Sequence, residues 1–593
     1  MPSVIVIGGG VAGLTAAHEL IERGFSVDVY DSRAAWGGKA RSQPVPGSGT
    51  NGRLDLPGEH GFRFYPRFYR HVIDTMNRIP HPAGGMVVDR LRSTTESAIA
   101  LVDHTTWFRF YRRAVLKPYD ILEALELFFQ ELDFDQVDVA LFAAKFLQFL
   151  TTSDARRLGE YEKQSWWEFL EGDKYSLRFQ GQLRAVPRTM VAMDPKRGSA
   201  RTIGTISMQL IFDYAKTAVN NDRTMGGPTT EMWIGPWTTH LQALGVKLHA
   251  GVAISEIEMA ASAITGVKLA DGTTARADYY VLAVPLDVAM RMITPQMGAA
   301  DPMLARLRAA TPDDLVSWMV GIQFFLYEDV PLVRGHTFYP DSPWSLTSIS
   351  QPQFWRDQGL FRKRYGNGEV GGLISVDISD WNTPGIYVPK PAKQCTAEEV
   401  AKEVWAQLKA GLNGTEPGEE ILTDDLLHSW HLDDDIDYSA GVPPKNNSRL
   451  LVHPPGSWAL RPDAGTEIRN LVLAGDYIRT YTDLASMEGA NEAARRAVNV
   501  ILQRSGADMP KVELWPLREP ERFEPWKRLD ERLYHMGQRH LFELMGIRRA
   551  AQAAEILRRF AAFTGISKID DLLDEVRATT IIQGLLQRLG ITT

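Results

Sequence analysis

Cysteine is almost absent from this sequence, whose 593 residues contain only Cys395. A single thiol excludes an internal disulfide framework and is typical of proteins kept in a reducing compartment. Long apolar runs are absent too, because no uninterrupted stretch reaches the roughly 18 residues that a membrane span needs. The apolar run at residues 4–7 has no basic segment before it, so it does not resemble a signal peptide. These absences favour a cytoplasmic protein.

The sequence also lacks an excess of basic over acidic residues and several familiar catalytic motifs. The formal net charge is -8, which excludes the electrostatic footprint of a protein that binds nucleic acid. No H-E-x-x-H, C-x-x-C, G-x-S-x-G or Walker pattern is present. The acidic run Asp433-Asp434-Asp435 beside His431 is interpreted as a solvated loop, since no second ligand cluster has recognisable spacing. Glu162 and Lys163 are likewise interpreted as the solvated face of a helix, and no metal is expected.

A dinucleotide-binding pattern opens the chain. An apolar strand at residues 4–7 leads into a G-x-G-x-x-G segment, a helix follows at residues 14–23, and a second strand follows at residues 26–30. In such units the glycines allow a tight turn and close approach of the backbone to a pyrophosphate, while the acid that ends the second strand binds ribose hydroxyls. The residues predicted to contact the nucleotide here are Gly8, Gly10, Val11, Ala12, Gly13, Asp31, Ser32 and Arg33.

The next segments resemble the phytoene desaturase and amine oxidase superfamily of flavoproteins. Gly37, Gly38, Lys39 and Arg41 fill the positions of its G-G-[KR]-x-R motif, in which glycine N–H groups and basic side chains can face an anion. The segment Gly58-Glu59-His60-Gly61-Phe62 is similar to the Gly-x-His-x-Phe stretch that passes near the flavin in that family. The resemblance implies FAD as the cofactor.

Distant segments continue the resemblance in family order. They imply further contacts to FAD from Val252, Ala283, Pro285, Gly475, Asp476, Ser486, Met487, Glu488 and Ala490. Asp476 would bind the ribityl chain, the backbone of Val252 would meet the adenine, and the helix that Ser486 opens would face the flavin. Ala494 departs from the usual glycine but remains small, so close helix packing is expected to survive.

The identity of residue 486 bears on the substrate. Amine oxidases of the superfamily carry an aromatic cage tyrosine at this position, whereas Ser486 resembles the carotenoid-desaturase branch. The resemblance implies an oxidoreductase that transfers hydride to or from a large apolar polyene of isoprenoid or polyketide type, by desaturation or by reductive cyclisation in specialised metabolism. A hydroxysqualene dehydroxylase-like enzyme, an amine oxidase and a non-catalytic flavin-binding prenyl carrier stay open as alternatives. His60 is the candidate catalytic side chain, a structural role being equally compatible, and NADPH is a candidate electron donor.

These patterns predict an α/β fold. A Rossmann-type FAD-binding domain would comprise residues 1–95, 241–300 and 460–505, with an inserted mixed α+β substrate domain at residues 96–240 and 301–459. Residues 96–240 are expected to be mostly helical, and Asp271-Gly272 to be a hairpin turn. A helical C-terminal extension at residues 506–593 would dock on the body or make a peripheral membrane contact, with Ile547, Ala551, Ala554 and Leu557 on its apolar face. The oligomeric state is left open.

Overall fold

A five-stranded parallel sheet forms the centre of the nucleotide-binding part. The computed structural model describes residues 1–102, 107–111, 135–191, 193–214, 222–414 and 420–545. In it the strands lie in the order β22 (Leu471–Leu473), β12 (Tyr279–Leu282), β1 (Ser3–Ile7), β2 (Ser26–Asp31) and β8 (Lys247–Ala250). All neighbouring pairs are parallel. Parallel strands covered on both faces are continuously apolar, as Val4 to Ile7 are.

Helices α1 (Val11–Ile21) and α16 (Met487–Ser505) pack against each other beside this sheet. Small side chains make the close approach possible, since Ala16, Ala17 and Ala494 are fully buried. Ala494 therefore keeps the packing that a glycine would allow. Helix α9 (Gly235–Ala243) also joins this unit, because the indole N–H of Trp237 donates to His18 of α1 at 3.2 Å. Helix α9 thus packs on the nucleotide-binding part, although most of it precedes residue 241, where the second segment of that domain was expected to start.

The strand-rich segment before residue 285 contains the expected hairpin. Strands β9 (Ile254–Ala260), β10 (Ala263–Leu269) and β11 (Thr274–Ala275) form an antiparallel sheet. Asp271 and Gly272 lie in the turn between β10 and β11, and Gly272 has a φ of 86°, which a glycine adopts without strain. Short helices α10 (Leu286–Met292), α11 (Pro295–Ala300), α12 (Pro302–Ala309) and α13 (Pro312–Leu315) then lead to the second half of the molecule.

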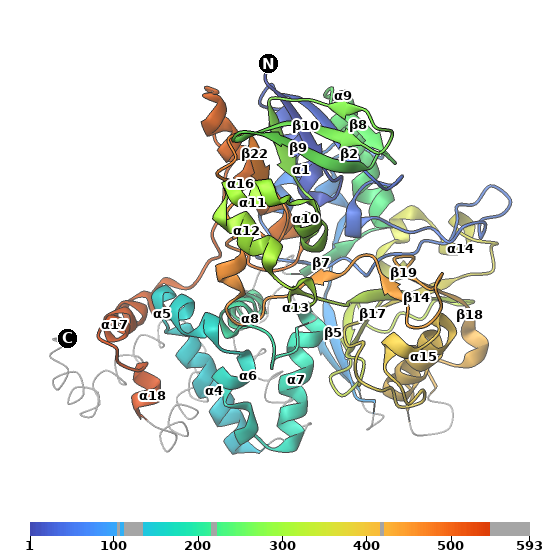
Figure 1. The fold of residues 1–593 in the computed structure, drawn as a ribbon. Coiled ribbons are helices and arrows are strands. Elements are labelled where there is room, and N and C mark those ends of the chain that lie inside the picture. Colours follow the sequence, from blue (N-terminus) through green and yellow to red (C-terminus); the bar gives the residue numbers. More distant parts are fainter. Residues whose placement is uncertain (103–106, 112–134, 192, 215–221, 415–419, 546–593) are drawn as a thin grey trace.

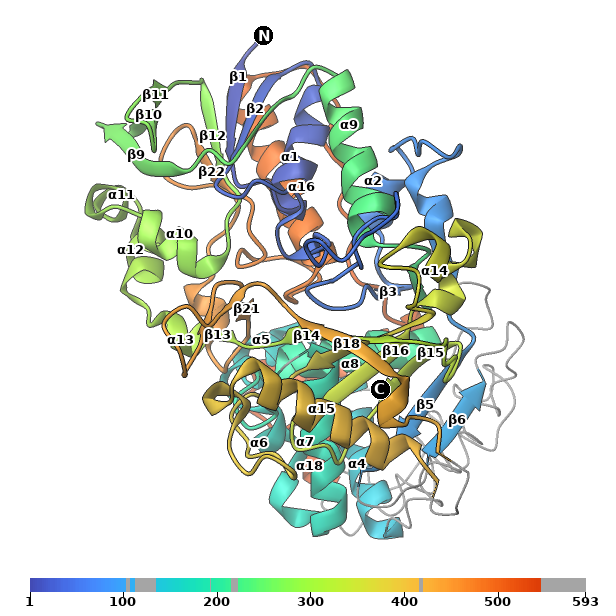
Figure 2. The same cartoon turned by 90° about the vertical axis from the view of Figure 1, so that its right-hand side faces the viewer.

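A seven-stranded, mostly antiparallel sheet forms that second half. Its order is β18 (Leu427–Leu432), β14 (Val320–Leu326), β17 (Gly372–Ile378), β16 (Leu346–Ser350), β15 (Gly335–Phe338), β5 (Glu96–Ala100) and β6 (Trp107–Tyr111). Helix α15 (Ala397–Leu412) covers one face, as Figure 2 shows, with Val400, Val404 and Leu408 buried at a spacing of four residues. The expectation of a mostly helical stretch from residue 96 was therefore wrong at its start, where β5 and β6 complete this sheet.

Helices do dominate the stretch from residue 136 to 214. They are α4 (Gln136–Leu150), α5 (Asp154–Gly159), α6 (Trp166–Leu170), α7 (Leu177–Val191) and α8 (Ala200–Tyr214). Figure 1 shows them as a layer beside the seven-stranded sheet and across from the nucleotide-binding part. A small sheet joins the two chain segments that flank these helices. Its central strand β7 (Asp222–Met225) follows the helices in the sequence and pairs with β3 (Tyr65–Pro66) and β4 (Leu91–Ser93), which precede them.

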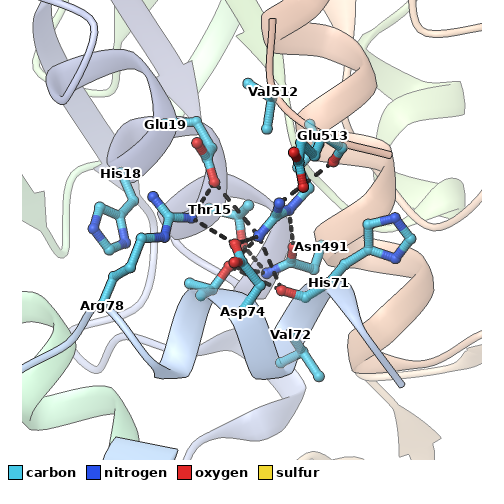
Figure 3. A network of polar contacts seen from close by, with 12 residues as sticks. Thr15, His18, Glu19, His71, Val72, Asp74, Arg78, Asn491, Val512 and Glu513 are labelled. Carbon is cyan, nitrogen blue, oxygen red and sulfur yellow. Dashed lines mark hydrogen bonds and ion pairs between the residues drawn. The ribbon is translucent and has the colours of Figure 1, made fainter. Parts of the chain in front are cut away.

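The start of the C-terminal extension is attached to the body by polar contacts. Figure 3 shows Glu19, Asp74 and Asn491 converging from α1, α2 (His71–Met76) and α16. They surround the guanidinium of Arg495, which donates to Asp74 at 2.6 Å and to the carbonyl oxygen of Glu513 in the extension at 3.4 Å.

Further along, α17 (Glu524–His535) packs against α5, and α18 (Leu541–Met545) ends the described part of the chain. The expected apolar face at Ile547, Ala551, Ala554 and Leu557 lies outside the described residues. Among the residues that are described, no helix has the length and apolarity required to cross a membrane.

Candidate active site

A cavity of about 600 Å³ opens where the five parallel strands end. Its lining includes Gly8 after β1, Asp31 at the end of β2, Val252 after β8, Ala283 after β12 and Asp476 after β22. The carboxyl ends of parallel strands face the same edge of a sheet, which is where α/β folds bind ligands. The topology therefore brings together residues that are separated by more than 460 positions in the sequence.

The three glycines of the first loop serve different purposes. Gly8 has a φ of 107°, and a Cβ on it would lie 2.5 Å from the carbonyl oxygen of Ala283. A Cβ on Gly13 would lie 1.8 Å from the carbonyl oxygen of Gly8, so both residues are required by the packing of the protein itself. At Gly10, by contrast, φ is -76° and a Cβ would find only the Cα of Gly38 within 4 Å, at 3.8 Å. Nothing in the described protein requires glycine at position 10, so the space beside it is available to a ligand.

Two helix N-termini face the cavity. Val11 and Ala12 of α1 line it, and no side chain caps this helix because its N-cap residue is Gly10. Uncapped N–H groups at the positive end of a helix are a ready anion site, which fits a pyrophosphate. At α16 the N-cap is Ser486, whose hydroxyl accepts from the N–H of Gly489 at 3.1 Å. Ser486, Met487 and Ala490 line the cavity from this second helix.

The carboxylate of Asp31 is held in place by the loops around it. One oxygen accepts from the N–H of Gly9 at 2.6 Å and the other from the N–H of Arg33 at 2.8 Å. The backbone N–H of Val252 in turn donates to the carbonyl oxygen of Asp31 at 2.8 Å. Any backbone contact from Val252 to an adenine would therefore have to use its carbonyl group. Ser32 lies beside them in the cavity wall.

The segment after the βαβ unit brings positive charge to the cavity. Gly37, Gly38 and Lys39 line it, and the ammonium group of Lys39 donates to the carbonyl oxygen of Arg449. Burial lowers the pKa of Lys39, although nearby carboxylates led by Asp476 oppose this shift. A cation in the same lining as the uncapped start of α1 suits a bound diphosphate. The chemistry of the lining thus fits the nucleotide half of FAD.

Comparison with known proteins agrees with this geometry. The sequence matches the family described as flavin containing amine oxidoreductase over residues 11–502. The chain belongs to this family. It is a flavin-dependent oxidoreductase with FAD as its cofactor, which confirms the cofactor, enzyme class and fold class expected from the sequence.

Individual relatives are more distant. The chain is 25% identical to zeta-carotene desaturase of Synechocystis over 84% of its own length and 97% of that protein. It is 22% identical to carotenoid phi-ring synthase of Streptomyces griseus over 85% of its length and 88% of that protein. Cyclohexylamine oxidase of Brevibacterium oxydans shares the fold with a TM-score of 0.54 at 15% identity, covering 85% of this chain and 99% of that one.

The cavity of this flavoprotein is also lined by residues outside the predicted cofactor segments. Apolar side chains come from residues 62–69, from α8 and from β15, and they are Phe62, Phe64, Phe68, Tyr69, Ile206, Leu210 and Phe338. Polar ones include Arg63, His336, Thr347 and Asp377. Apart from Phe62, sequence reasoning missed them. Helix α8 and the seven-stranded sheet are placed here only by tertiary packing, and none of their lining residues forms a motif.

His60 and the acidic loop form a buried polar cluster at one side of the cavity. A ring nitrogen of His60 binds the carboxylate of Asp433, which also accepts from Gln43 at 2.9 Å. Asp435 accepts from Arg33 at 2.9 Å and from Arg41 at 3.1 Å.

The interpretation of this run as solvated was wrong for two of its three members, since Asp433 and Asp435 are buried and only Asp434 is exposed. Burial opposes the ionisation of Asp433 and Asp435, but their partners outweigh it. The charge and hydrogen bond of His60 lower the pKa of Asp433, and Ser448 with the arginines lowers that of Asp435 to about 2. Ligand atoms of His60, Asp433 and Asp435 lie within 4.8 Å of one another. Asp433 pairs with His60, and Asp435 pairs with Arg33 and Arg41, so the charges of both carboxylates are balanced by protein side chains.

Four of the residues predicted to bind the cofactor do not line the cavity. Gly13 packs under the first loop, Arg41 pairs with Asp435, and Gly58 exchanges backbone hydrogen bonds with Gln43. Glu488 points away, because its carboxylate accepts from the N–H groups of Arg70, His71 and Val72 at 2.7 to 2.9 Å. It caps α2 rather than facing the flavin, since a carboxylate is stabilised at a helix N-terminus.

The placement of Glu162 was also wrong. It is buried rather than solvated, and its carboxylate accepts from Ser199 and Arg201 at 2.9 Å each. A third bond comes from the N–H of Trp458 at 2.8 Å. Glu162 therefore ties α8 to the loop before β22, which is a structural role.

Proposed function

We propose that this flavoprotein transfers hydride between FAD and an allylic or conjugated carbon of a long apolar polyene, with desaturation of an isoprenoid chain as the leading reaction. The observation that carries the proposal is the apolar extension of the cavity. Phe62, Phe64 and Phe68 face it from one segment, while Ile206 and Leu210 face it from α8. Such walls bind hydrocarbon by burial, at about 25 cal/mol per Å² of apolar surface.

Different residues would bind the cofactor and the substrate. The first loop, Asp31 and Lys39 would hold the ADP half of FAD. Asp476 and the start of α16 would hold the ribityl chain and the flavin. When bound, FAD supplies the hydride acceptor or donor. The apolar wall would orient the chain and exclude water from the reacting carbon.

The names of the relatives support an isoprenoid substrate, because zeta-carotene desaturase and carotenoid phi-ring synthase both match over more than four fifths of this chain. Amine oxidation is less well supported. Ser486 stands at the position of the cage tyrosine, and its hydroxyl is engaged in capping α16. Reductive cyclisation uses the same site in the opposite direction and is the second candidate, with NADPH as the electron donor.

Anaerobic mixing of the yellow holoprotein with candidate reductants tests the proposal. Zeta-carotene in detergent micelles should bleach the flavin absorbance, whereas cyclohexylamine should not. Bleaching by NADPH alone would favour the reductive direction. Bleaching by the amine and none by any polyene would contradict the proposal.

A matched pair of variants tests the apolar wall. Leu210→Trp fills the cavity from α8 and should slow bleaching by the polyene. Leu177→Trp places the same change on α7, where the side chain is 85% exposed, and should leave the rate unchanged. Equal rates in both variants would show that the wall does not bind the chain.

A further inference from the structure

A buried carboxyl group faces the apolar half of the cavity. Asp377 lies on β17, between Gly321 of β14 and Thr347 of β16, and is 5% exposed. It lines the cavity together with His60, Gly61 and Phe62. The approach is close, because a Cβ on Gly61 would come within 2.6 Å of Oδ1 of Asp377. This oxygen is buried, and within the described residues it has no hydrogen-bond partner.

The charged groups around Asp377 do not neutralise it. The nearest cation is Arg63, but its guanidinium is shared with Glu59 at 3.5 Å and with the carbonyl oxygen of Lys39 at 2.9 Å. Asp433 adds a like charge and is itself bound to His60. Burial raises the pKa of Asp377 to about 7; Arg63 and the N–H of Phe62 oppose this shift, and Asp433 adds to it. His60, Tyr69 and His336 are further titratable side chains in the cavity lining.

A pure hydrocarbon does not complement such a wall. A buried polar oxygen without a hydrogen bond is unfavourable, and a hydrocarbon lying on it would prevent water from satisfying it. A ligand oxygen would remove that penalty, because a neutral carboxyl donates to a carbonyl or hydroxyl oxygen and a carboxylate accepts from a hydroxyl.

We infer that Asp377 is a specificity-determining residue that binds a hydroxyl or carbonyl oxygen carried by the otherwise apolar substrate. The inference rests on the proposed function, which places the apolar chain in this cavity. An ammonium group fits less well, because Arg63 lies on the same side and the carboxyl is only partly ionised at neutral pH. The oxygen function therefore gives the cavity a polar anchor that sets which end of the chain lies near His60 and Gly61.

Calorimetric titration of the holoprotein with three ligands of one chain length tests this. The probes are farnesol, β-farnesene and farnesylamine, presented on cyclodextrin. Farnesol should bind about tenfold more tightly than β-farnesene, as one hydrogen bond to a buried carboxyl implies. Asp377→Leu should abolish that preference. The control Ser375→Ala, two residues along β17 and outside the cavity lining, should keep it.

A pH profile provides a second measurement that does not depend on how Asp377→Leu folds. Farnesylacetone offers only an acceptor, so it binds the protonated carboxyl. With a pKa of about 7, its affinity should fall about tenfold from pH 6 to pH 8. In Asp377→Asn, which folds around an amide of the same shape, the affinity should not change with pH.

The outcomes separate the inference from the function on which it rests. Equal binding of farnesol and β-farnesene, a preference that survives in Asp377→Leu, or tightest binding of farnesylamine would each overturn the role of Asp377 while leaving an apolar substrate in place. Holoprotein that binds none of the three ligands would contradict the proposed function itself.

Discussion

Replacement of Gly10 by valine should remove the cofactor without disturbing the protein. The backbone at Gly10 has a φ of -76°, which any residue adopts, and an added Cβ meets only Gly38 at 3.8 Å. The apoprotein should therefore lose less than about 1 kcal/mol of stability. The affinity for FAD should fall far more, because the valine side chain would occupy the space beside the uncapped start of α1. Each charged hydrogen bond lost there costs about 1.5–3 kcal/mol, or roughly 10- to 150-fold in affinity.

Gly13→Ala is the matched control for that experiment. Its Cβ would lie 1.8 Å from the carbonyl oxygen of Gly8, so helix and strand must move apart at a cost of about 1–3 kcal/mol. Flavin content after gel filtration and the thermal midpoint of the apoprotein are measured for both variants. Gly10→Val should lose flavin at an unchanged midpoint, whereas Gly13→Ala should lower the midpoint. Stoichiometric flavin in Gly10→Val, or equal midpoints in the two variants, would refute the reasoning.

Three further predictions concern buried carboxylates. Burial raises the pKa of Asp377 from 3.8 to about 7, so the folded protein keeps a proton that the unfolded chain releases. The contribution of Asp377 to stability should then fall by up to about 4 kcal/mol between pH 4 and pH 7 in thermal unfolding. Asp377→Asn should lose stability over this range by that much less than the unsubstituted protein, which keeps the other buried carboxyl groups; parallel profiles would contradict it. Glu488→Gln should cost about 1–3 kcal/mol through the cap of α2 but leave the flavin content unchanged, so flavin loss would restore a cofactor role. Asp530→Ala removes the 2.9 Å ion pair with Arg156 and should speed proteolysis within α17; an unchanged cleavage rate would show that the pair does not hold that helix.

The nucleotide half of the site could be predicted from sequence because local signals coincide with topology. Gly8, Asp31 and Asp476 each follow an apolar run, and such runs formed parallel strands whose ends must meet at one edge. The predictions from sequence were wrong where polar neighbours suggested that a side chain is exposed to solvent. Asp433 and Glu162 are acidic residues in polar surroundings, and nothing nearby in the sequence indicates that His60 and Arg201 neutralise them. Long-range ion pairs have no periodicity that a sequence pattern can show.

Asp377 marks the limit of that reasoning most clearly. On an antiparallel strand, alternate residues face opposite sides of the sheet, so periodicity can place Asp377 on one face but cannot say what covers that face. Here the face is covered by the segment of His60 and Gly61, more than 300 residues earlier in the chain, and Gly61 leaves the space that the carboxyl occupies. A buried acid on a sheet lined with phenylalanines conflicts with simple core packing, and natural proteins retain such conflicts mainly where a ligand resolves them. The substrate preference that we infer for this flavoprotein therefore depends on a residue that lies far in the sequence from every cofactor motif.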